Sequence, residues 1–383
     1  MINIPIDYET LRIIWWLLLA TLLAGFAIMD GFDLGVAAQL LVVARTEKER
    51  RVVINSVGPV WEGNQVWFIL GGGAVFAAFP LLYATAFSGF YAAMFLVLLT
   101  FIVRPVSFDY RSKVNDPRWR GVWDIVMSVA AAAAALLFGV AVGNLFLGVP
   151  YHFTSDLHLV YEGGLIGLLR PFALLCGVAS VAMLLMHGAA WLLFKTEGAV
   201  VSRARRVLIW SSAILVALFA LGGIWLAFGM NGYVVTSTIN PAAPSNPLLK
   251  QVAAEPGAWL SVYSRHPWAV LAPILGFGGP LLALFLAWRE RVTWCLLPSA
   301  VGILGVIFTA GLSLFPFLMP SDAVPSDSLT IWDASSSQRT LFIMLIAVII
   351  FLPIVLAYTS WVFSILRGKV TAAYIEENKH SLY

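Results

Sequence analysis

The chain has 383 residues, of which 61% are hydrophobic, 13% aromatic and only 11% charged. Soluble domains carry about 25% charged residues, so this composition excludes a soluble enzyme, a secreted disulfide scaffold and a nucleic-acid-binding protein. The formal net charge of +3 is too small to form a basic binding face. The two cysteines, Cys176 and Cys295, lie in or beside apolar segments outside any CxxC motif, so they indicate neither a disulfide framework nor a metal site.

Apolar stretches of about twenty residues, the length that crosses a bilayer, recur along nearly the whole sequence. We therefore expect an all-α polytopic membrane protein, with one integral membrane domain over residues 1–383. Pro59 is expected to kink the second helix, because proline lacks a backbone donor. The longest connection, about 230–265, is expected to form an ordered surface loop. The nine predicted spans cover about 10–44, 52–80, 83–104, 123–149, 167–194, 206–229, 266–288, 294–316 and 339–366.

The basic residues predict how the spans are oriented, because loops rich in lysine and arginine stay in the cytoplasm. Alternate loops hold 18 of the 23 lysines and arginines. This pattern predicts an N-terminus outside and a cytoplasmic C-terminus. The basic loops fall at 45–51, 104–120, 195–206, 289–291 and 367–379, and the other five basic residues are Arg12, Arg170, Lys250, Arg265 and Arg339.

Three carboxylates lie inside predicted spans: Asp30 and Asp33 in the first, and Glu62 in the second. An ionisable group at bilayer depth costs about 2.5–3.5 kcal/mol or more and indicates a functional site. Asp30 and Asp33 are three positions apart and so share one helical face. At the helical rise, Asp33 lies about 18 Å before Arg45 and Glu62 about 16 Å after Arg51. Since the two helices run in opposite directions, we expect these carboxylates at nearly the same depth, where Asp33 and Glu62 meet at one hydrated spot.

Trp61, Asn64 and Gln65 place further polar side chains next to Glu62 in the sequence. Acids and amides at matched depth could line a hydrated proton route from the cytoplasm. The alternative is that these groups only hydrogen-bond neighbouring helices and fix their packing. The acids that flank the next basic loop are expected to form ordinary ion pairs with its cations. These acids are Asp109, Asp116 and Asp124, and the cations are Arg104, Arg111 and Lys113.

Histidine is the usual axial ligand of a haem. His187 is the only one of the five histidines that falls well within a predicted span, since His266 stands at the outer end of the span 266–288, whereas a bis-histidine haem needs two buried ligands. Met183 or Met186 could complete a ligand pair, but both also suit an apolar core. The chain alone is therefore expected to be poorly equipped to hold a b-type haem, with His187 as its one candidate ligand.

A series of motifs resembles subunit II of the bd-type quinol oxidases, the terminal respiratory oxidases of bacteria. The resemblance extends from the first span to the end at Ser381-Leu-Tyr383, and several of the motifs are compositionally unusual for membrane helices. The motifs are Asp30-Gly-Phe-Asp33-Leu-Gly35, Trp61-Glu62-Gly-Asn64-Gln65-Val-Trp67, Phe87-Ser-Gly-Phe-Tyr91, Arg104-Pro-Val-Ser-Phe-Asp109-Tyr-Arg111, Gly232-Tyr-Val-Val235 and Trp332-Asp-Ala-Ser-Ser-Ser-Gln338.

The resemblance implies an inner-membrane complex that oxidises quinol, reduces oxygen to water and builds a proton-motive force. It places two haems b and one haem d in a partner, subunit I. It implies that subunit II supports haem assembly, contributes a proton path and in some members holds a quinone or lipid as a structural filler. Small single-span subunits can join such complexes. The implied fold is two four-helix bundles, here about 10–149 and 167–316, plus a peripheral helix at about 339–366.

The resemblance also carries over to individual residues. Asp33 matches the second acid of the first motif, and Glu62 stands where the family often has aspartate. Arg104 and Asp109 match the motif at the end of the third span, as charge or structural support. Two other functions stay open: a purely structural scaffold, and a proton-coupled secondary transporter that uses the same buried acids.

Overall fold

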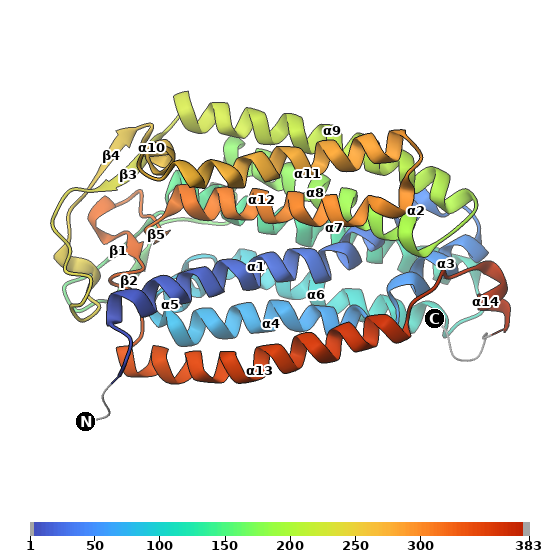
Figure 1. Cartoon of the computed structure of the whole chain (residues 1–383), viewed down its shortest axis with the longest axis horizontal. Helices are drawn as coiled ribbons and strands as arrows, with labels where there is room; N and C mark the ends of the chain where they lie inside the picture. Colours follow the sequence, from blue (N-terminus) through green and yellow to red (C-terminus); the bar gives the residue numbers. More distant parts are fainter. Residues whose placement is uncertain (1–3, 378–383) are drawn as a thin grey trace.

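The computed structural model describes residues 4–377. Its long helices run side by side in one elongated bundle, with the strands at one end and α3 and α14 at the other (Figure 1). We call the end with the strands the hairpin end, and the end with α3 and α14 the basic end. The helices are α1 Tyr8–Ala38, α2 Leu40–Val43, α3 Glu47–Val57, α4 Trp61–Ala78, α5 Pro80–Gly89, α6 Tyr91–Arg111, α7 Pro117–Leu147, α8 Pro171–Lys195, α9 Ala199–Phe228, α10 Ser261–Arg265, α11 Leu271–Trp288, α12 Leu296–Leu314, α13 Gln338–Ile365 and α14 Ala372–Glu377. The strands are β1 Tyr151–Phe153, β2 Leu159–Tyr161, β3 Asn231–Val235, β4 Val252–Pro256, β5 Phe317–Met319 and β6 Leu329–Thr330.

Within residues 4–377, eight helical segments are long and apolar enough to cross a membrane. They contain α1, α6, α7, α8, α9, α11, α12 and α13. The pair α4 and α5 passes the same test only when taken together, and it is bent by 118°. The expected all-α polytopic fold is therefore confirmed.

The bounds predicted for the second and third spans are wrong. The segment expected at 52–80 is interrupted between α3 and α4, and Pro59 lies in that interruption instead of kinking a continuous helix. The third long helix begins at Tyr91 instead of residue 83, because a separate short helix starts at Pro80. Proline has no backbone N–H to continue the preceding helix but suits the first turn of a new one.

Two close crossings place α8 at the centre of the bundle. A Cβ on Gly35 would lie 1.9 Å from the Leu184 carbonyl oxygen, and one on Gly188 would lie 2.4 Å from the Gly35 carbonyl carbon. The backbones of α1 and α8 therefore touch where only glycine fits. Gly139 brings α7 equally close, since its Cβ would lie 2.3 Å from the Cys176 carbonyl oxygen.

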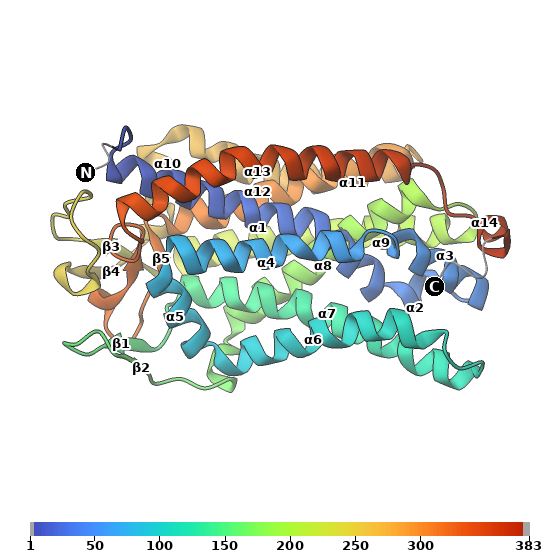
Figure 2. The same cartoon turned by 90° about the horizontal axis from the view of Figure 1, so that it is seen from below.

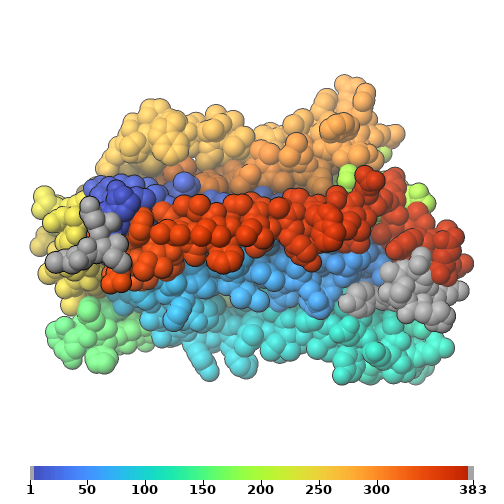
Figure 3. Space-filling view, turned by 60° about the horizontal axis from the view of Figure 1, so that its bottom comes forward, coloured from blue at the N-terminus to red at the C-terminus, as the bar shows by residue number. Residues whose placement is uncertain are grey.

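The long helices form two groups that meet along α8. One group contains α1, α4, α6 and α7, and the other contains α8, α9, α11 and α12. Helix α13 runs along the outside of the first group, next to α1 and α4 (Figures 2 and 3). It buries only Leu341 and Leu345, so most of its surface is available to lipid or to another subunit.

The hairpin end is built from short antiparallel pairs. Strand β3 pairs with β4 inside the predicted loop 230–265, which is thus ordered as expected. Arg12, buried in the first turns of α1, donates to the backbone carbonyls of Pro241 and Ala243 in this loop and to the Ser335 hydroxyl. These bonds fix the loop to the helical bundle.

Basic residues gather at the opposite end. The helix directions bring the segments 45–51, 104–120, 195–206, 289–291 and 367–369 to the basic end (Figure 1). Lys379 and His380 lie outside the described residues. The gathering of basic segments at one end of the bundle thus agrees with the alternation of basic and non-basic loops in the sequence.

Candidate functional site

A buried ion pair joins α1 to α6. Arg104 Nη2 donates to Asp30 Oδ1 at 2.7 Å, and the two side chains are 2% and 0% exposed. The same nitrogen lies 3.4 Å from Oε1 of Gln65 on α4. The guanidinium therefore sits where three helices meet.

The second acid of α1 faces α4. Asp33 follows Asp30 by one turn, and its Oδ2 accepts a hydrogen bond of 2.8 Å from Asn64 Nδ2. Trp61, one turn before Asn64, stacks on Phe108 of α6 with ring centroids 5.5 Å apart and 5° between the planes. The indole and phenyl rings thus form a flat apolar wall beside the polar groups.

We call these five side chains, Asp30, Asp33, Asn64, Gln65 and Arg104, the intramembrane cluster. It holds two carboxylates and one guanidinium, so it carries one net negative charge when both acids are ionised. Taking up a single proton makes it neutral, which favours proton exchange in an apolar environment. Several of its buried atoms also lack a hydrogen-bond partner among the described residues, and such atoms are suited to bind water or a polar ligand. These atoms, with the adjacent indole nitrogen, are Asp30 Oδ2, Asp33 Oδ1, Arg104 Nε and Nη1, and Trp61 Nε1.

The cluster lies near the basic end of the bundle. Helix α1 ends at Ala38, five residues after Asp33, and α6 ends at Arg111, seven residues after Arg104. These intervals correspond to about 8 and 10 Å of helix. The cluster thus lies one to two turns from the ends of these two helices that face the basic end.

Glu62 does not join the cluster, and the expectation that its carboxylate meets Asp33 is wrong. Asn64, which contacts Asp33, is two positions further along α4, a rotation of about 200°. Glu62 therefore points the opposite way and is exposed. Its neighbours on this face are apolar and exposed: Val66 at 44%, Ile69 at 66% and Leu70 at 40%.

A second set of ion pairs lies at the basic end of the bundle. Arg111 Nε donates to Asp124 Oδ1 at 2.6 Å, and its two terminal nitrogens reach both Glu47 oxygens at 2.9 and 2.8 Å. Arg50 completes the set by donating to Asp124 Oδ2 at 2.9 Å. The ion pairing expected for Asp124 is thus present, although Arg104 pairs with Asp30 instead of with an acid of its own loop.

The other acids near this loop have different roles. Asp116 caps α7 by accepting from the Arg118 backbone N–H at 2.8 Å. Asp109 is exposed and forms no ion pair within residues 4–377. Glu49, at the start of α3, accepts from both terminal nitrogens of Arg203, and these bonds lower the pKa of its carboxyl to about 2.

His187 is buried, and both of its ring nitrogens already have partners. Nδ1 lies 2.8 Å from Ser299 Oγ, and Nε2 lies 2.9 Å from the Ile28 carbonyl oxygen. Neither nitrogen is free to bind a metal in this arrangement. Met183 and Met186 pack in the hydrophobic core.

The chain is similar to known proteins along nearly its whole length. Residues 11–366 match the family described as "Cytochrome bd terminal oxidase subunit II". The chain is 48% identical over 378 residues to the "Probable cytochrome oxidase subunit 2" of Haemophilus influenzae, covering 99% of this chain and 100% of that one. It is 46% identical over 380 residues to the "Cytochrome bd-I ubiquinol oxidase subunit 2" of Escherichia coli, with the same coverage. The chain belongs to the cytochrome bd oxidase subunit II family.

The family likeness extends to distant members. The Bacillus subtilis "Cytochrome bd ubiquinol oxidase subunit 2" is 30% identical over 370 residues, covering 94% of this chain and 97% of that one. A chain of the bd oxidase from Geobacillus thermodenitrificans matches in fold, with a TM-score of 0.69 at 15% identity, over 93% of this chain and 98% of that one. This bd oxidase subunit II is therefore a bacterial multi-pass inner-membrane protein and part of an oxidoreductase complex that contains subunit I and haem.

The residues described here do not provide a haem site in this subunit. His187 is occupied by hydrogen bonds on both sides, and His152 pairs with Glu162 at 3.1 Å. His158 and His266 are exposed. No group of three or more possible metal ligands occurs within residues 4–377. The side chains of subunit II thus do not fit the haem that its family implies for the complex.

The polar residues of α6 are more deeply buried than the sequence predicted. Arg104, Ser107 and Arg111 are all buried in α6, although the predicted third span ends at Arg104 and places Arg111 in the loop that follows. Their spacing of three and then four residues is that of one helical face. This periodicity of polar residues was the available signal for a buried polar stripe from the basic end to the intramembrane cluster.

Proposed function

We propose that this chain is the non-haem-ligating subunit of a cytochrome bd-type quinol oxidase and carries protons from the cytoplasm toward subunit I. The observation that supports this role most strongly is the buried set of Asp30, Asp33 and Arg104. Arg104 pairs with Asp30, and the second acid, Asp33, is buried one turn away with a hydrogen bond from Asn64, so the set can accept one proton without leaving an uncompensated charge. The unpartnered oxygens of both acids provide the sites where that proton can bind.

The exposed face of α4 supports a contact with subunit I. A lone carboxylate at Glu62 among Val66, Ile69 and Leu70 would cost about 2.5–3.5 kcal/mol or more if it faced lipid. A partner that offers a polar group or water at this point removes that cost. We propose that subunit I covers this face and that Glu62 transfers protons across the subunit boundary, from Asp33 by way of Asn64, Gln65 and bound water. The Trp61 side chain would form one wall of this route.

The remaining parts of the complex follow from the family. We propose two haems b and one haem d in subunit I, small single-span subunits at the periphery, and support of haem assembly by this chain. The relatives from E. coli and B. subtilis are named ubiquinol oxidase subunits, which supports a quinol as electron donor. The unpartnered atoms beside Trp61 suit a polar headgroup, so a structural quinone or lipid could also bind there.

The proton path is tested with two variants of the purified complex in proteoliposomes. Asp33→Asn and Glu62→Gln keep the shape of each side chain and remove its titratable group, so we expect each to slow proton uptake and turnover by at least about tenfold. Glu197→Gln, an exposed acid at the same end, serves as the control and should behave like wild type. Turnover is measured per haem, against pH.

The outcome also separates the competing functions. A purely structural scaffold predicts lower yield of complex but wild-type turnover per haem and an unchanged pH profile in both variants. A secondary transporter predicts that the chain purifies without a haem-bearing partner. Wild-type turnover and uptake in both variants at every pH would sink the proposed proton path.

A further inference from the structure

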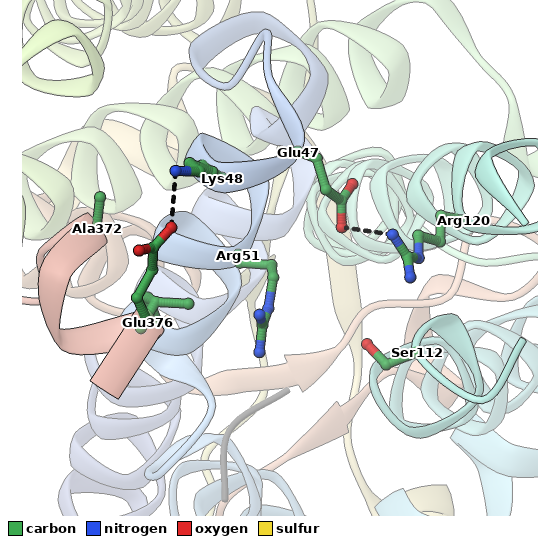
Figure 4. A pocket seen from close by; sticks show the side chains of 8 residues that line it. Glu47, Lys48, Arg51, Ser112, Arg120, Ala372 and Glu376 are labelled. Atoms are coloured by element: carbon green, nitrogen blue, oxygen red, sulfur yellow. Dashed lines mark ion pairs between the residues drawn. The ribbon is translucent and has the colours of Figure 1, made fainter. Parts of the chain in front are cut away.

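Charged side chains around the pocket at the basic end pair with one another (Figure 4). Lys48 Nζ lies 2.7 Å from Glu376 Oε1. Arg120 Nη1 lies 3.7 Å from Glu47 Oε1. His187 of α8, in contrast, is an ionisable side chain buried inside the helical bundle, at 1% exposure, and no step of the proposed proton path uses it.

The imidazole ring of His187 joins three helices. Its Nε2 lies 2.9 Å from the backbone carbonyl oxygen of Ile28 on α1, and its Nδ1 lies 2.8 Å from Ser299 Oγ on α12. A carbonyl oxygen can only accept a hydrogen bond, so Nε2 is the donor in the bond to Ile28. The ring therefore links α8 to α1 by one directional bond.

This bond lies next to the intramembrane cluster along α1. Ile28 precedes Asp30 by two residues, which is about 3 Å of helix. The side of α1 that meets α8 carries Gly35, whose Cβ would touch the α8 backbone. Gly35 is two positions from Asp33, a rotation of about 200°. His187 therefore holds α1 on the side away from the cluster, at nearly the same depth.

The remaining contact between α1 and α8 opposes rotation of α1 only weakly. Gly35 has no side chain that could interlock with the neighbouring helix. One turn after Ile28, Phe32 stacks on Trp191, with ring centroids 4.1 Å apart and 13° between the planes. Stacked rings can slide over each other, whereas a hydrogen bond weakens steeply once its angle falls below about 120°. The bond from His187 is therefore the sharper restraint on the rotation of α1.

We propose that His187 is a positioning residue for proton uptake. Its bond to the Ile28 carbonyl holds α1 in the rotation that directs Asp30 and Asp33 at their partners on α6 and α4. This inference rests on the proton path proposed above. The two cluster contacts are 2.7 and 2.8 Å long. A rotation of about 20° moves an atom that lies about 5–6 Å from the helix axis by about 2 Å, which is enough to break both contacts.

The test measures proton uptake and turnover per haem, against pH, in the purified complex in proteoliposomes. His187→Met keeps most of the side-chain volume and removes the hydrogen-bond donor. We expect it to slow both rates by at least about tenfold, because a misplacement of about 1 Å can cost about a hundredfold. We also expect the pH profile to shift, which a loss of packing alone does not cause. His187→Leu serves as a second apolar variant.

Two controls isolate the bond to α1. His187→Gln should behave like wild type, because its amide N–H can replace Nε2 as the donor to the Ile28 carbonyl. Ser299→Ala removes the bond on the α12 side and leaves the bond to α1, so its pH profile should remain that of wild type. Slow turnover of His187→Gln, or a shift in Ser299→Ala as large as that in His187→Met, would overturn the inference.

A double variant shows whether His187 acts through the acids of α1. Adding His187→Met to Asp33→Asn should slow uptake little further, because the contact that His187 positions is already lost. Additive slowing, or assembly of His187→Gln but of neither apolar variant, would show a general structural role and overturn the inference. Slow Asp33→Asn with wild-type rates in His187→Met overturns this inference alone. Wild-type rates in Asp33→Asn overturn the proton path and this inference with it.

Discussion

The Asp30–Arg104 pair illustrates how a buried charge constrains a membrane protein at the scale of single residues. Both side chains are almost fully buried and 2.7 Å apart. Removing one partner of such a pair leaves the other charge uncompensated, which costs about 3–5 kcal/mol. Removing both charges avoids that penalty.

We therefore expect Arg104→Met to destabilise the complex by about 3–5 kcal/mol, because Asp30 loses its only cation among the described residues. Adding Asp30→Asn to this variant should restore a large part of the loss. Thermal unfolding of the purified complex measures both effects, and each single variant completes the double-mutant cycle. A double variant whose loss equals the sum of the single losses would show that the two charges do not interact.

Glu49 provides a pH-dependent contribution to stability. The bonds from Arg203 hold its pKa at about 2, against about 4.5 for a free carboxyl. Since the folded state lowers this pKa, the contribution is fully present above pH 4.5 and is lost as the pH falls from 4.5 toward 2.

Glu49→Gln should consequently lower stability by about 1–3 kcal/mol at pH 7, and the difference from wild type should shrink as the pH falls below 4.5. Melting temperatures between pH 7 and pH 3.5 provide the measurement. Glu197→Gln, whose side chain is exposed, should follow wild type throughout. A gap that stays constant with pH contradicts the assigned cause.

Among the helices, the crossing of α1 and α8 leaves the least space. The hypothetical Cβ distances at Gly35 and Gly188 are far below any van der Waals contact, and the atoms met are backbone atoms that cannot rotate away. A side chain here must push the two helix axes apart, which would also displace Asp30 and Asp33 from α4.

Gly188→Val should accordingly prevent assembly or destabilise the subunit by more than about 4 kcal/mol. Gly223→Val is the matched control, because a Cβ on Gly223 of α9 would meet nothing within 4 Å. The yield of intact complex after detergent extraction measures both. Normal assembly of Gly188→Val would show that the crossing adapts more easily than its geometry indicates.

The sequence could predict how deep a side chain lies in the membrane better than it could predict which way that side chain faces. It correctly predicted that Asp30, Asp33, Asn64 and Gln65 lie at a similar depth, because the rise per residue is constant within a helix. It misplaced the direction of Glu62, because the break at Pro59 separates α4 from the helix before it and leaves its rotation to tertiary packing. The contact of Asn64 with Asp33, which no spacing encodes, fixes that rotation.

At the scale of the whole molecule, His187 is the one buried histidine of residues 4–377, and both of its ring nitrogens have hydrogen-bond partners. This chain has a buried polar cluster and an exposed acid, and the proposed function assigns the haem ligands to subunit I. The family resemblance implies haems in subunit I, and the two hydrogen bonds of His187 make its part in this assignment open to test.

His187→Gln in the intact complex should therefore leave the reduced-minus-oxidised haem spectrum unchanged in position and in amplitude per complex. Glutamine can keep one of the two hydrogen bonds, to Ser299 or to the Ile28 carbonyl, so that the fold is maintained. Loss or shift of a haem band would show that His187 binds iron after all.

The exposed face of α4 that carries Glu62 affects the stability of the subunit before it assembles with subunit I. Newly inserted copies without subunit I would present the Glu62 carboxylate to hydrocarbon beside Val66 and Ile69, at a cost of about 2.5–3.5 kcal/mol or more. If subunit I covers this face as proposed, orphan copies are less stable than paired ones in the same bilayer, and membrane proteases that act on partly unfolded chains remove them first. One acidic side chain can in this way help to keep the two large subunits in equal numbers.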